Sequence, residues 1–183
     1  LGGTMERPML TFDAKGEALA FEKRMEAAVL EARGEWQGDA DPRVQLKLAG
    51  RKITAGVMRF ESISAGITGT LASHTINIGA TAPGADFAAR FEGELRAEHN
   101  WAGRVVSLAN RGRLPFTLRA PVSLEAGTAR TVLGEATADA LGGQLALRSL
   151  RWENSRLTSE GGFTGVPAAA LLAPAGPDLS RAR

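Results

Sequence analysis

The strongest constraint in this sequence is a repeated two-residue alternation of apolar and polar side chains. Successive side chains of a β-strand point to opposite faces, so this period gives each strand one apolar side and one wet side. One-sided strands are typical of antiparallel sheets, because parallel sheets are covered on both faces. The clearest alternating segments are 44–48, 75–78, 87–92, 114–121, 145–148 and 150–152. The sequence therefore predicts an all-β, antiparallel-rich fold.

Glycine recurs along the alternating region about every eight to twelve residues, the spacing of turns in an all-β protein. We interpret these glycines as turns or bulges: Gly16, Gly34, Gly38, Gly50, Gly56, Gly66, Gly69, Gly79, Gly84, Gly93, Gly103, Gly112, Gly127, Gly134 and Gly142. Ala82-Pro83-Gly84-Ala85 fits a type II turn. Hairpin tips are expected at 110–112, 125–127 and 141–144.

One segment, residues 21–33, is ambiguous. It is rich in helix formers, and Phe21, Met25, Ala28, Val29 and Ala32 fall at helical spacing. However, no capping side chain precedes Phe21. The favoured alternative is a pair of strands, Glu17–Phe21 and Ala27–Trp36, around a charged turn at 22–24.

The length of 183 residues suits one domain. We predict one β-rich domain over residues 1–166. The Pro/Ala-rich residues 167–183 read as a linker or tail, with one short helical turn at Ala168–Leu172. The chain begins with Leu1 and shows no signal peptide, so we expect it to be either mature or cut from a longer protein, and we favour the second interpretation. No stretch approaches the roughly 18 apolar residues of a membrane span.

The charge balance gives no case for a nucleic-acid partner. Lys and Arg number 22 against 20 Asp and Glu, a formal charge of +2. Nucleic-acid binding would call for a basic stripe. The absence of cysteine excludes disulfides, zinc–thiolate sites and iron–sulfur clusters.

No motif in the chain indicates catalysis, a cofactor or a metal. His74 and His99 are the only histidines, and without cysteine they would need carboxylates to hold a metal. We interpret both as structural or surface residues. The sequence holds no G-x-S-x-G, and neither 66–69 nor 161–165 forms a phosphate loop with its lysine. We therefore expect a protein that is not an enzyme, with no catalytic residue, cofactor or metal.

The apolar phase of the strands is the informative feature. It could fill the core of a closed β-sandwich or barrel that serves as a structural or protein-binding module. It could also stay partly uncovered and line a groove for acyl tails, since an apolar groove offers no directional groups. The candidate groove-lining residues are Leu46, Leu48, Ile76, Ile78, Phe87, Phe91, Phe116, Leu118, Leu145 and Leu147.

Several short motifs, taken in their order, resemble a known family. They are Gly69-Thr70-Leu71-Ala72-Ser73-His74, Trp101-Ala102-Gly103, the strand Leu114–Leu124, Leu150-Arg151-Trp152 and Gly161-Gly162-Phe163-Thr164-Gly165-Val166-Pro167. This pattern resembles the TamB-type translocation and assembly module, within the AsmA-like group of bacterial envelope proteins. The resemblance spans about residues 60–170, and the first sixty residues fit in composition and alternation.

The resemblance implies an elongated, curved antiparallel sheet, a taco-like β-trough with an apolar concave face, of which this chain is one segment in a longer repetitive array. It also implies a periplasmic protein anchored in the inner membrane of a Gram-negative bacterium. Such a protein carries phospholipid between the inner and outer membranes and supports outer-membrane protein assembly and secretion. The implied partners are phospholipid acyl chains and, through the parent protein rather than this segment, an outer-membrane BamA-like barrel.

Overall fold

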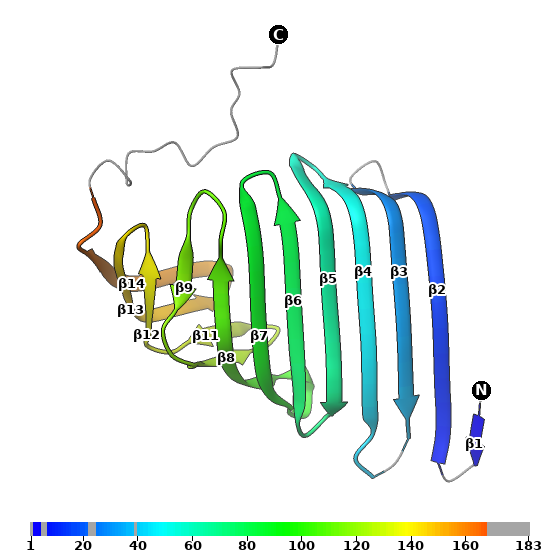
Figure 1. The fold of residues 1–183 in the computed structure, drawn as a ribbon. Coiled ribbons are helices and arrows are strands. Elements are labelled where there is room, and N and C mark those ends of the chain that lie inside the picture. Colours follow the sequence, from blue (N-terminus) through cyan, green and yellow to red (C-terminus); the bar gives the residue numbers. More distant parts are fainter. Residues whose placement is uncertain (1, 5–6, 22–24, 39, 168–183) are drawn as a thin grey trace.

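The strands of the chain form one antiparallel sheet (Figure 1). The computed structural model describes residues 2–4, 7–21, 25–38 and 40–167. Within these residues 14 strands belong to a single sheet, and the one helical element is a short 3₁₀ turn, η1 (Ala97–His99). The predicted all-β, antiparallel fold is confirmed. The predictions for residues 168–183 and for the turn at 22–24 lie outside the described residues.

Consecutive strands pair with each other as a meander. Their bounds are β1 Gly2–Thr4, β2 Arg7–Phe21, β3 Met25–Gln37, β4 Arg43–Ala55, β5 Met58–Thr70, β6 His74–Ala82, β7 Ala85–Leu95, β8 Trp101–Asn110, β9 Phe116–Leu118, β10 Val122–Ala126, β11 Arg130–Leu133, β12 Ala136–Ala140, β13 Gly143–Glu153 and β14 Arg156–Thr164. The strands β2–β7 lie side by side as a broad panel, and the sheet turns away from this panel beyond β8 (Figure 1).

The ambiguous segment forms strands, as the favoured interpretation predicted. β2 and β3 pair antiparallel, with Leu19 opposite Ala27 and Gly16 opposite Leu30. Tertiary pairing therefore overrides the helix propensity of this segment. Both strands extend further than predicted, since β2 begins at Arg7 and β3 ends at Gln37.

The short strands β9 and β10 together form one interrupted strand of the meander, and β11 and β12 form the next. β9 and β10 both pair with β8, and β11 and β12 both pair with β13. Pro121, which has no backbone N–H to donate, lies in the break between β9 and β10. Hydrogen bonds at both breaks continue the ladder, from Arg119 N to Thr137 O at 2.9 Å and from Gly134 N to Ser123 O at 2.9 Å. The meander is therefore unbroken from β1 to β14.

The predicted turns and the predicted role of the glycines have different outcomes. Pro83-Gly84 joins β6 to β7 with a φ of 80° at Gly84, as a type II turn requires. Leu141-Gly142 joins β12 to β13 with two positive φ angles, 54° and 82°. The prediction that glycines mark turns or bulges is wrong for seven of them. These lie inside strands, one in each strand from β2 to β8, and coincide with neither a turn nor a register shift: Gly16, Gly34, Gly50, Gly66, Gly79, Gly93 and Gly103.

The sheet is a single layer and encloses no core of large side chains. The buried apolar residues of the described chain are small or β-branched: Ala27, Ile53, Ala89, Ala102, Val105, Val122, Ala138 and Ala140. None of the side chains described has less than 2% of its surface exposed. Stability must therefore come from the hydrogen-bonded ladder and from neighbours on each face. The closed-sandwich alternative is not what these strands form.

Candidate functional site: an uncovered apolar face

The alternation places apolar side chains from successive strands in rows that run across the sheet. In one row Leu46 pairs with Ile67, Ile67 with Ile76, Ile76 with Phe91 and Phe91 with Val105. Residues directly opposite in neighbouring strands point to the same side. We call the side that carries this row the apolar face, and the other side the polar face.

A second row lies beside the first on the same strands. Leu48 pairs with Ala65, Ala65 with Ile78, Ile78 with Ala89 and Ala89 with Leu108. Phe87 lies two residues from Ala89 along β7, opposite Ala80, and therefore also on the apolar face. The six predicted groove residues of β4–β7 thus share one surface.

The four candidates near the C-terminal end belong to the same face. Asn110 connects the two regions, because it pairs with both Phe87 and Phe116. From there Leu118 pairs with Ala138, Ala138 with Leu145 and Ala136 with Leu147. All ten predicted side chains are therefore brought to one side of one sheet, and their binding of a ligand stays a prediction.

The apolar face is uncovered in the part of the chain that the structure describes. Phe12 is 45% exposed, Met58 57% and Ile78 37%. The nine candidate residues other than Ile78 are half-buried among their neighbours on the sheet. β4 has 13 residues, which extend about 40 Å, and the seven strands β2–β8 span roughly 29 Å. The geometric area of this panel of the sheet is therefore on the order of 1,000 Å². Contiguous exposed apolar surface of several hundred Å² is a feature that binding sites share.

Interior glycines make parts of the apolar face flat. A Cβ added at Gly50 would lie 2.6 Å from Cδ1 of Ile53, and one at Gly16 would lie 2.7 Å from Cδ1 of Leu19. The Phe12 ring likewise occupies the space above Gly34. Large side chains therefore lie down over neighbouring glycines, and the same contact explains why these glycines stand inside strands instead of at turns.

At the edge where β6 and β8 begin, one polar pair interrupts the apolar face. The indole N–H of Trp101 donates to Nε2 of His74 at 2.7 Å. Because Nε2 accepts, Nδ1 carries the proton of the neutral ring, and it lies 3.0 Å from the Thr70 carbonyl oxygen, which accepts from it. Phe91 meets the Trp101 ring edge-on, with ring centroids 6.4 Å apart. Both ring nitrogens of His74 therefore have partners within the protein.

The polar face carries ion pairs between side chains of the same strand and of neighbouring strands. Glu92 accepts hydrogen bonds from Arg104 at 2.8 Å and from Arg90 at 2.9 Å. The hydrogen bond from Arg104 is the main cause that lowers the pKa of Glu92 below its ordinary value, and desolvation opposes it. Asp139 accepts from Arg119 at 2.8 Å. The polar face is therefore solvated and carries both positive and negative side chains, unlike the apolar face.

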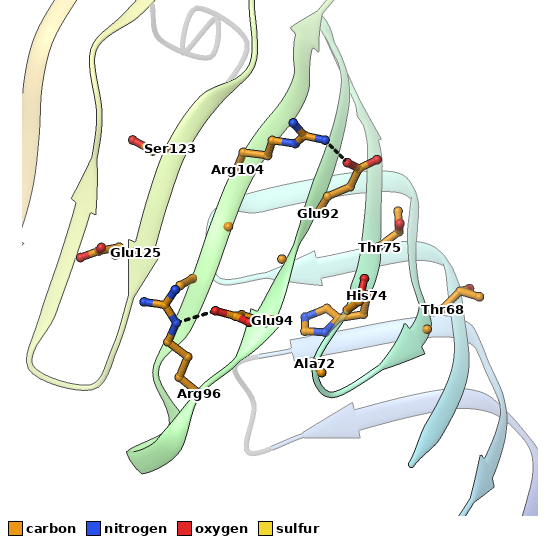
Figure 2. A pocket seen from close by; sticks show the side chains of 15 residues that line it. Thr68, Ala72, His74, Thr75, Glu92, Glu94, Arg96, Arg104, Ser123 and Glu125 are labelled. Carbon is orange, nitrogen blue, oxygen red and sulfur yellow. Dashed lines mark hydrogen bonds and ion pairs between the residues drawn. The ribbon is translucent and has the colours of Figure 1, made fainter. Parts of the chain in front are cut away.

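A hollow of about 780 Å³ lies mainly on the polar side of β5–β10 (Figure 2). Its wall includes Thr75, Glu92, Arg104 and Ser123, which stand on the neighbouring strands β6, β7, β8 and β10. It is separate from the ten candidate residues. No cluster of three or more metal-ligating side chains occurs in the described ranges.

Sequence reasoning missed the contact between Trp101 and His74. Both residues stand in the short motifs that carry the family resemblance, so a signal existed. Their separation of 27 positions hid the contact, because only the β6–β7–β8 register brings the two side chains together.

Comparison with known proteins gives one match. A family model described as "TamB, N-terminal domain" matches residues 1–131. The match includes the first sixty residues, which the sequence motifs did not cover. Neither the curated proteins nor the solved structures yield a match to the chain. No helix of the described residues has the length and apolarity needed to cross a membrane.

Proposed function

This chain belongs to the TamB family, and we propose on that premise that its apolar face carries phospholipid acyl chains. In this proposal the chain is one segment of a bridge protein that moves phospholipid between the inner and outer membranes and supports outer-membrane protein assembly. The observation that carries it is the single-layer sheet, whose apolar rows are continuous across β4–β8 and have no covering layer in the described chain.

The chemistry of the face suits acyl chains better than a ligand with polar groups. Its side chains along the first row, Leu46, Ile67, Ile76 and Phe91, offer no hydrogen-bond donor or acceptor. Transfer of each methylene from water to such a surface is favourable by about 0.8 kcal/mol. Retention then grows with chain length and needs no specific contact.

The direction of the rows supports movement along the sheet. The rows run across the strands, so a ligand that leaves Leu46 meets Ile67, then Ile76, then Phe91 at steps of about 4.8 Å. Each step offers a surface of nearly the same chemistry. A path of similar, weak contacts favours transport, whereas one deep pocket would favour storage.

The proposed setting is the periplasm, with the parent protein anchored in the inner membrane of a Gram-negative bacterium. A BamA-like outer-membrane barrel would be its partner through other parts of the parent protein. The role proposed for this segment is non-catalytic, because its candidate site offers apolar surface and no nucleophile.

A matched pair of substitutions tests the proposal. Ile76 lies on the apolar face of β6, and its neighbour Asn77 lies on the polar face. We expect Ile76→Asp to reduce binding of a fluorescent fatty acid at least about tenfold, because a carboxylate would be desolvated under the acyl chain. Asn77→Asp adds the same charge to the other face and should leave binding unchanged. Equal affinity of both variants, with β-sheet circular dichroism preserved, would contradict the proposal.

A further inference from the structure

The Trp101 ring lies over a part of the apolar face that has no side chains. Gly93 and Gly103 stand directly opposite each other on β7 and β8. A Cβ added at Gly93 would lie 2.5 Å from Cζ2 of Trp101, and one at Gly103 would lie 2.7 Å from Cη2. The indole therefore rests on bare backbone, with nothing between the ring and the strands. Glycine inside a strand often marks such a close approach of another group.

Besides the glycine backbone, side chains of two neighbouring strands hold the ring in this position. The indole N–H donates to His74 on β6, and the Phe91 ring on β7 lies nearly perpendicular to the indole. Both contacts belong to one side chain, so rotation about the side-chain bonds of Trp101 breaks them together. Trp101 is the first residue of β8, and its backbone pairs with Leu95 and Ala126 whatever the ring does.

The surface under the ring continues the acyl-binding rows. Phe91 and Val105, two residues along β7 and β8 from the glycine pair, belong to the first apolar row. Without the indole, the two glycines would form the floor of a recess that opens onto this row, with Phe91 and Val105 at one end. Such a recess is apolar and free of side chains, and it suits a single acyl chain.

We propose that the surface over Gly93 and Gly103 is an acyl-chain subsite and that the Trp101 indole is its displaceable occupant. An arriving acyl chain takes the place of the ring, and the bond to His74 sets how readily the ring leaves. This inference rests on the proposed function and deepens it, since it names one place on the apolar face where a chain is held.

The test compares the affinity of the 183-residue chain and its variants for anthroyloxy-stearic acid, a fluorescent fatty acid. Trp101→Ala empties the recess and should bind the probe more tightly than the parent chain. His74→Leu keeps the indole but removes its acceptor. It should also bind more tightly, by about fivefold, the factor that one net hydrogen bond represents. Two independent variants keep the test valid if one of them fails to fold.

Trp36→Ala is the matched control. Trp36 lies opposite Leu10 and Val44 on the same face, far along the sheet on β3. Loss of the Trp36 side chain removes apolar surface, so the affinity of this variant for the probe should be equal to that of the parent chain or lower. If Trp101→Ala and His74→Leu also bind the probe no better than the parent chain, Trp101 is a fixed part of the wall and the subsite does not exist. Absence of binding by every chain, the parent included, would overturn the proposed function as well.

Discussion

Ala18 and Lys52 lie in one row across the sheet, on β2 and β4, and both have a left-handed backbone, with φ of 51° and 49°. The apolar side chains change phase at this row. On β4 the apolar face carries Leu48 and Gly50 before Lys52, and Ile53 after it. We call the row that contains Ala18 and Lys52 the crease. Because neighbouring strands change phase together there, apolar side chains stay on the same face of the sheet on both sides of the crease.

Relief of backbone strain at Lys52 gives a first prediction. A left-handed residue with a Cβ costs about 1–2 kcal/mol, and glycine carries no such cost. Lys52→Gly should therefore raise the free energy of unfolding by about 1 kcal/mol in urea denaturation. Lys47→Gly, on the same strand with ordinary φ, should lower it by roughly 0.5–1 kcal/mol. A loss of stability in both variants would show that the left-handed conformation carries no strain.

The C-terminal part of the apolar face can be tested separately. Leu147 lies opposite Ala136 on the apolar face, and Ala146 lies opposite Thr137 on the polar face. Leu147→Asp should weaken fatty-acid binding, because the new carboxylate would be desolvated by a bound chain. Ala146→Asp should not, since its carboxylate stays in water. If both variants keep the affinity of the parent chain, the lipid path does not extend to β13.

The pKa of Glu92 provides an electrostatic prediction. The pKa of Glu92 is lowered mainly by the hydrogen bond from Arg104, which has a larger effect than the one from Arg90. Arg104→Gln should therefore raise the pKa of Glu92 more than Arg90→Gln does, as measured by NMR titration of the carboxyl carbon. A depressed carboxyl pKa stabilises the fold above the ordinary glutamate pKa, and this contribution is lost as the pH falls through the lowered value. The opposite order of the two variants would assign the main hydrogen bond to Arg90.

Interior glycines should differ sharply in their tolerance of a methyl group. A Cβ at Gly103 would overlap the Glu92 carbonyl oxygen, whereas the nearest atom to one at Gly66 is 3.7 Å away. Gly103→Ala should lower the free energy of unfolding by about 1–3 kcal/mol, the usual effect of overpacking. Gly66→Ala should be neutral or stabilising by up to about 1 kcal/mol. Thermal unfolding of the two variants measures the difference, and similar melting temperatures would contradict it.

Much of the fold was predictable from the alternation. It predicted which side chains of each strand share a face, including those of Leu46, Ile76 and Phe91. The register of the meander then places the apolar sides of successive strands on the same face of the sheet. Strand length was less predictable, because an isolated glycine such as Gly34 reads as a turn when its neighbours are unknown. Only the register shows that the Phe12 ring fills the space above Gly34.

The crease and the interrupted strands show a different limit. The change of phase between Leu48 and Ile53 is visible in the sequence, yet it also fits two separate strands. Pairing with β3 and β5 on both sides of Lys52 decides that β4 is continuous. Pro121 likewise signals a break, but not that β9 and β10 continue along the same partner strand.

The plain hairpin-by-hairpin connectivity has a consequence for how far such a protein reaches. Each further hairpin would add two strand spacings, roughly 10 Å, and leave every earlier residue in place. Reach could therefore change in fixed increments, by duplication or loss of hairpins, without redesign of the surface already built.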